Sequence, residues 1–178
     1  MSDCHIDIQL ETSPLPYILS PDAIQTVASQ LLSFLGLDGY ELSLRFVSQE
    51  EIQALNAQYR SLDKPTDVLS FPQEEWHAPL LILEEESGKK RYKKKPIFPA
   101  LLGDIVISLD EAEKNAHDIG HSLDREVCFL LIHGLLHLCG HDHLVADEEA
   151  LMIEQQQKLL ARLQDQGACP WKDMVTKK

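Results

Sequence analysis

The chain has 178 residues, of which 44% are hydrophobic and 25% are charged, and its formal net charge at pH 7 is −13. This length and composition predict one domain, spanning 1–178, with a sizeable buried core. The negative charge argues against a broad nucleic-acid-binding surface. No apolar run approaches the roughly 18 residues that span a bilayer, and the N-terminus lacks the pattern of a secretion signal. We therefore expect no membrane contact and a cytoplasmic location.

The first part of the chain predicts strands that alternate with helices. Apolar residues at every second position predict half-buried strands over 5–10 and 42–46. Between them, a helix is expected to begin after Ser20, whose hydroxyl can accept a backbone hydrogen bond, and to end at Gly36. Ser48 opens a second helix as the first residue of a capping box. This part of the chain therefore contributes two strands and two helices.

The middle of the chain continues the alternation but is interrupted once. A short strand over 68–69 is expected to end at Pro72, which cannot donate a ladder hydrogen bond. The segment 73–100 is rich in charge and proline and has little periodicity. It predicts a long surface insertion rather than a second domain, because it is too short for its own core. A fourth, strongly apolar strand is expected over 103–108, and Ser108 begins a short helix.

Two further helices complete the predicted domain. Ser122 can cap a helix whose apolar residues, between Val127 and Leu138, cover it almost all round. Such a helix must be central and buried. A last helix over about 147–166 is expected to pack outside it, and 167–178 forms a C-terminal tail.

The buried helix carries the most informative motif, HGLLHLCGHDH over 133–143. His133 and His137 are four residues apart and therefore lie on one helical face, with Cβ atoms about 5–6 Å apart. Gly140 can end the helix, so that the next residues bring His143 back toward the first two histidines. Three neutral nitrogen donors with an open fourth position suit one catalytic zinc ion.

Two neighbours of these histidines leave alternatives open. His141 could replace His143 as the third ligand, support the ligands or contact solvent, although the spacing favours His143. Cys139 could close the site as a thiolate and make it structural, although the helix turn is expected to point it away. The cysteines show no CxxC spacing, so thiols are expected rather than a disulfide framework.

The residue after the first histidine bears on the reaction. In zinc peptidases with an HExxH motif, the glutamate at this position is the general base. Gly134 occupies it here, so a zinc peptidase or amidase is only the second hypothesis. Zinc-assisted hydrolysis of a phosphodiester depends less on that glutamate. Arg60 could then bind phosphate oxygens with its planar fork, or it could be an ordinary helix-end cation.

Further cations could contribute to a local positive cleft. Lys64 and Ser70 are candidate contacts for a substrate phosphate, although turn chemistry explains Lys64 and a strand end explains Ser70 equally well. The run from Lys89 to Lys95, KKRYKKK, holds six of the 16 basic residues. It could bind a polyanion, or it could be a solvated loop of mixed charge.

Three segments together resemble the YbeY family of metal-dependent endoribonucleases. They are NAQYRSLDKPTDVLSFP (56–72), LGDIVIS (102–108) and HGLLHLCGHDH (133–143), and the likeness extends over about 5–165. The resemblance implies a single α+β domain with a small mixed four-stranded sheet, surrounding helices and a central metal-binding helix. The segment 73–100 is longer than we expect for the family.

The resemblance also implies a site and a function. One zinc ion would be held by His133, His137 and His143, and Arg60 would line the cleft beside it. The protein would be a single-strand-preferring endoribonuclease that acts on ribosomal RNA of the small subunit, in maturation of its 3′ end and in ribosome quality control.

The sequence leaves two points open. A third hypothesis is a non-catalytic ribosome-assembly factor whose zinc only holds the fold. The general base is not assigned, because Asp67 and Asp104 could equally cap turns and Asp142 could orient a histidine. The sequence does not indicate an oligomeric state.

Overall fold

The computed structural model of the chain describes residues 5–11, 20–82 and 100–167. Within these ranges the elements follow in the order β1 (His5–Leu10), α1 (Pro21–Phe34), β2 (Tyr40–Val47), α2 (Gln49–Arg60), β3 (Val68–Pro72), β4 (Ala100–Ser108), α3 (Leu109–Ile119), α4 (Leu123–Leu138) and α5 (Ala146–Asp165). They form a single α+β domain around a mixed four-stranded sheet, so the expected fold class is confirmed.

The strands are ordered β1-β2-β4-β3 across the sheet. The first three of these strands are parallel, and β3 pairs antiparallel with β4. Leu44 on β2 lies opposite Ile8 on β1 and Ile105 on β4, so apolar side chains from three strands share one face. Strand β4 begins at Ala100, three residues before the expected start at Gly103. Apolar and polar residues alternate only weakly before Gly103, so the sequence did not predict the earlier start of the strand.

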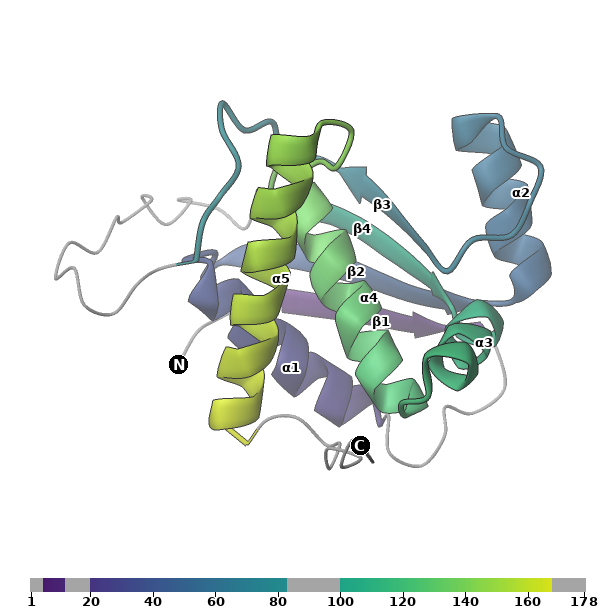
Figure 1. Ribbon diagram of the computed structural model, residues 1–178, viewed down its shortest axis with the longest axis horizontal. Helices are drawn as coiled ribbons and strands as arrows, with labels where there is room; N and C mark the ends of the chain where they lie inside the picture. Colours follow the sequence, from purple (N-terminus) through teal and green to yellow (C-terminus); the bar gives the residue numbers. More distant parts are fainter. Residues whose placement is uncertain (1–4, 12–19, 83–99, 168–178) are drawn as a thin grey trace, which may run out of the picture.

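Helices cover both faces of the sheet. Figure 1 shows α1, α4 and α5 side by side over one face, with α2 apart from them. The larger core lies beneath these three helices and includes Leu44 and Ile105. On the other face, Ile52 of α2 packs with Leu69 and Val106 in a smaller core.

Serine side chains begin four of the five helices in the described part of the chain, as the sequence predicts. In each case the hydroxyl accepts a hydrogen bond from the backbone N–H three residues later, which satisfies one donor of the first turn. The four serines are Ser20, Ser48, Ser108 and Ser122. These caps explain why the helix starts were predicted closely.

Helix α4 is the central helix of the domain. Its apolar side chains are almost all buried, among them Leu131 and Leu135, which are at most 2% exposed. No helix within the described ranges is both long and apolar enough to cross a membrane.

The described part of the expected insertion, 73–82, is not a plain surface loop. Trp76 and Leu80 pack against the larger core, and Ile82 belongs to it. The Ile82 N–H donates to Oε1 of Gln155 on α5, at 3.0 Å. The sequence did not predict these contacts, because single apolar residues in a charged segment carry no periodicity. The rest of the insertion, with the basic run 89–95, and the tail from 168 lie outside the described residues.

Candidate metal centre

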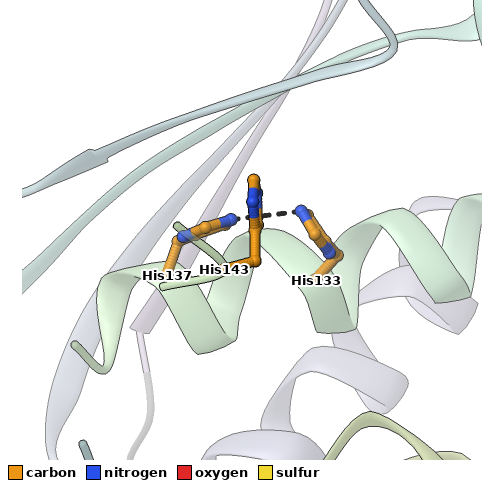
Figure 2. Close-up of side chains that lie close together, drawn as sticks. All are labelled: His133, His137 and His143. Carbon is orange, nitrogen blue, oxygen red and sulfur yellow. Dashed lines mark hydrogen bonds between the residues drawn. The ribbon is translucent and has the colours of Figure 1, made fainter. Parts of the chain in front are cut away.

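Three histidines converge at the C-terminal end of α4. Figure 2 shows His133 and His137 projecting from the helix and His143 returning from the following turn, with all three rings directed toward one another. One nitrogen from each ring lies within 4.8 Å of the others, and the Nε2 atoms of His133 and His137 are 3.1 Å apart. Two nitrogens bound to one tetrahedral zinc ion are about 3.3 Å apart, so the pair needs little movement to hold the ion.

The turn that carries His143 is held by an indole ring. Gly140 adopts a φ of 86°, the left-handed conformation that lets the chain reverse after the helix. Trp76 packs against this glycine, and a Cβ at position 140 would lie 3.2 Å from that of Trp76. The Trp76 Nε1–H also donates to the carbonyl of Leu138 at 2.7 Å, which satisfies a free carbonyl of the last turn.

Hydrogen bonds fix the orientation of the two helical histidines. The Nδ1 atom of His137 lies 3.0 Å from the carbonyl of His141, to which it can only donate. Its Nε2 therefore keeps a lone pair directed at the other rings. The Nδ1 atom of His133 lies 2.7 Å from the side-chain amide of Gln156 on α5. Such partners of metal-binding histidines set the tautomer and the ring orientation.

Gln156 was not among the residues that the sequence singled out. The buried residues of α5 are Met152, Gln155, Leu159 and Leu163, so the polar residue of the apolar stripe is Gln155. Gln156 is only partly buried beside it, so no periodic pattern indicated its contact with His133.

Burial favours the neutral form of the two helical histidines. It is the largest reason that the pKa of His133 is lowered from 6.5 to about 4, and the neighbouring His137 and His143 contribute to the same shift. Burial is also the main reason that the pKa of His137 is lowered. Neutral imidazole is the form that binds a metal ion, so the lowered pKa of these two rings favours metal binding.

His141 and Cys139 lie away from the three converging rings. Nε2 of His141 is 2.6 Å from the carbonyl of Leu80, and the ring is only 3% exposed. Cys139 is fully buried in the larger core. The structure thus brings His143, rather than either neighbour, to the two helical histidines.

Gly134 lets α4 approach the sheet closely beside His133. A Cβ at this position would lie 2.9 Å from Cγ2 of Ile105 and 3.1 Å from Oγ of Ser70. Ser70 is buried and donates its hydroxyl hydrogen to the Gly134 carbonyl at 3.2 Å. Because its one proton is used there, Ser70 is better suited to hold α4 against β3 than to donate to a substrate phosphate.

Arg60 lies in the last turn of α2, and its side chain is exposed. The pKa of His137 is lowered mainly by burial, and the positive charge of Arg60 is a smaller cause of the same shift. The guanidinium is therefore within electrostatic reach of that ring. Lys64 is also exposed, and its backbone carbonyl accepts a hydrogen bond from Asn56 Nδ2 at 2.8 Å. Asn56 is buried, so it anchors the loop after α2 on which Lys64 lies.

Two of the three carboxylates left open by the sequence, Asp67 and Asp142, have structural partners. Asp67 accepts from the Val68 N–H at 2.8 Å and from Asn115 Nδ2 at 3.0 Å. Asp142 accepts from the His143 N–H at 2.7 Å, which stabilises the turn that positions this ring. Both carboxylates therefore support the site, and neither is identified by its contacts as a general base.

The fold and the site define a class of protein: a single-domain α+β protein in which a central helix and the turn after it present three histidines suited to a metal ion. The model of the family described as Endoribonuclease YbeY matches residues 9–164, and the chain belongs to this family. The resemblance seen in the sequence is thus confirmed.

Curated relatives and a solved structure agree with this assignment. Endoribonuclease YbeY of Halalkalibacterium halodurans is 46% identical over 121 residues, which cover 68% of this chain and 70% of the relative. Endoribonuclease YbeY of Geobacillus kaustophilus is 40% identical over 162 residues, 89% of this chain and 95% of the relative. The solution structure of TM1509 from Thermotoga maritima shares the fold with a TM-score of 0.57, at 23% identity, over 97% of this chain and 99% of that one.

Proposed function

We propose that this protein is a zinc-dependent endoribonuclease that cleaves single-stranded RNA, with ribosomal RNA of the small subunit as its substrate. The role would be maturation of the 3′ end of that RNA and ribosome quality control in the cytoplasm. The observation that carries the proposal is the convergence of three imidazoles, two with a lowered pKa and the third solvent-exposed, within electrostatic reach of an arginine.

Each residue of the site would have a defined task. His133, His137 and His143 would hold the ion, which when bound supplies Lewis acidity for hydrolysis of a phosphodiester. Arg60 would bind phosphate oxygens through its planar fork and stabilise the negative charge that develops on them. Lys64 would add a second positive contact to the RNA backbone.

The peptidase alternative has less support at Gly134. An HExxH peptidase needs a glutamate at this position. Any side chain here would place its Cβ against Ile105 and Ser70. The same close packing would orient such a side chain toward the sheet. We therefore rank RNA above peptides as the substrate.

The test compares purified zinc-loaded variants on a single-stranded RNA from the small-subunit 3′ end. We expect Arg60→Ala to lower kcat/KM about a hundredfold without changing the zinc content, because one charge-stabilising contact is typically worth 10²–10³. Arg125→Ala, at the opposite end of α4, is the matched control. Equal rates for both variants would contradict the role of Arg60.

Substrate choice provides the second arm of this test. Turnover of denatured protein but not of RNA would favour the peptidase. A protein that cleaves neither substrate and unfolds when zinc is chelated would favour the structural-zinc alternative.

A further inference from the structure

Helix α4 leaves one large apolar side chain partly in solvent. Its other apolar residues between Val127 and Leu138 are at most 4% exposed, whereas Phe129 is 39% exposed. Removing exposed apolar surface from water is favourable by about 25 cal/mol per Å². An exposed phenylalanine alone is ordinary, so its position decides whether it has a function.

Phe129 lies one helical turn before His133 and therefore on the face that carries the candidate metal site. The two rings are close to parallel, with an interplanar angle of 27° and centroids 6.3 Å apart. The phenyl ring thus continues the surface of the imidazole along the helix. A flat ring placed there lies beside the candidate metal site.

The charge of the protein makes such a surface useful for RNA binding. With a net charge of −13, the molecule as a whole repels a polyanion, and Arg60 is a cation within electrostatic reach of His137. Stacking of a base on an aromatic ring does not depend on net charge and tolerates any base. A base can reach such a ring only when it is not paired in a duplex.

We propose that Phe129 is a specificity-determining residue on which a base next to the cleaved phosphodiester stacks. This inference rests on the proposed function and deepens it, because it gives a physical reason for a preference for single-stranded RNA. The nucleotide would flank the cleavage position on the side of His133, whereas Arg60 acts near His137.

The first test measures cleavage of a single-stranded RNA with one defined cleavage site. We expect Phe129→Ala to raise KM about tenfold with an unchanged zinc content, and Phe129→Trp to restore the wild-type value. Leu10→Ala is the matched control, because Leu10 is 40% exposed but lies on β1, at the sheet edge opposite β3. A KM for Phe129→Ala equal to that of the control would overturn the proposal.

A modified RNA separates stacking from a general loss of structure. When the nucleotides on both sides of the cleavage position lack their bases, wild type and Phe129→Ala should have the same KM, because the contact is already absent. A tenfold difference that persists on this RNA would show that the phenyl ring does not act through a base.

A binding measurement keeps the inference distinct from the proposed function. In Phe129→Trp, a stacked base should quench the fluorescence of the new indole when single-stranded RNA is added, relative to the wild-type signal. Absence of cleavage with clear quenching would reject the proposed activity but keep the stacking surface. Cleavage without additional quenching would support the proposed activity and reject the stacking surface.

Discussion

The hydrogen-bond partner of His133 bears on which of its ring nitrogens can bind a metal ion. Gln156 reaches Nδ1 of His133 with its amide nitrogen, and Nε2 of His133 faces Nε2 of His137 at 3.1 Å. For Nε2 of His133 to hold an ion, the ring proton would sit on Nδ1, where the amide oxygen of Gln156 could accept its hydrogen bond after a rotation of the amide.

Loss of this partner should weaken metal binding. We expect Gln156→Leu to lower zinc affinity about ten- to hundredfold, as is typical when the partner of a metal-binding histidine is removed. Gln156→Glu should retain affinity, because a carboxylate accepts the same proton. Competition with a chromophoric chelator measures the affinity, and Gln157→Leu, an exposed neighbour on α5, is the control. Equal affinities for the two leucine variants would show that Gln156 does not orient His133.

The lowered pKa of His133 predicts how the metal-free protein responds to acid. The ring titrates near 6.5 in the unfolded chain and at about 4 in the folded protein. Between these values the unfolded state binds a proton that the folded state does not, so the free energy of unfolding falls as pH is lowered from 6.5 to 4. The full effect of this group is about 3 kcal/mol at most.

Urea unfolding of metal-free protein at pH 7 and pH 4.5 measures this effect. His133→Gln, which has no ionisable ring, should lose about 1–3 kcal/mol less over this interval than wild type. The comparison between variants removes the contribution of Glu126, whose pKa is raised by burial and which acts in the opposite direction. Identical losses in the two proteins would mean that His133 is not the group responsible.

At the level of elements, the separation between α4 and β4 depends on Gly134. We expect Gly134→Ala to lower the free energy of unfolding by about 1–3 kcal/mol, because the new methyl group meets Ile105. It should also weaken zinc binding by shifting His133. Urea unfolding and chelator competition measure the two effects.

A double variant identifies the cause. Ile105→Ala removes the side-chain atoms that the new methyl group meets, so the effects of Gly134→Ala and Ile105→Ala on stability should not add. Strictly additive effects would place the origin of the destabilisation elsewhere.

The sequence predicted the elements better than their contacts. Serine caps such as Ser48 and Ser122 are local signals, and the helix starts they mark agree with the structure. The convergence of His133, His137 and His143 was predictable because helical spacing and one glycine turn determine it. These predictions succeed where the interacting residues are near one another in the chain.

Contacts between distant segments were not predictable in this way. Trp76 caps α4 from 62 residues away, and Gln156 reaches His133 from another helix. The order of strands in the sheet likewise depends on pairing between distant segments. A single sequence carries no pattern for such contacts, because they depend on how whole elements pack.

For the whole molecule, the net charge predicts a weak dependence of RNA binding on salt. If Arg60 and Lys64 are the main cation contacts, the slope of log K against log salt should be near −1.4, about −0.7 for each contact on a single strand. Arg60→Gln should reduce the slope by about 0.7, whereas Lys114→Gln, in an exposed pair with Glu111, should not change it. Anisotropy of labelled RNA at several salt concentrations measures the slopes. A slope unaffected by Arg60→Gln would exclude a direct contact with the phosphates.

The three converging histidines all come from one stretch of 11 residues at the end of α4. An ion held there would close only a short loop and would not join distant parts of the chain. It would therefore lower the conformational entropy of the unfolded chain only a little. The sheet and both cores have their own packing and do not include these rings. We therefore expect the scaffold to stay folded whichever cation the three rings hold.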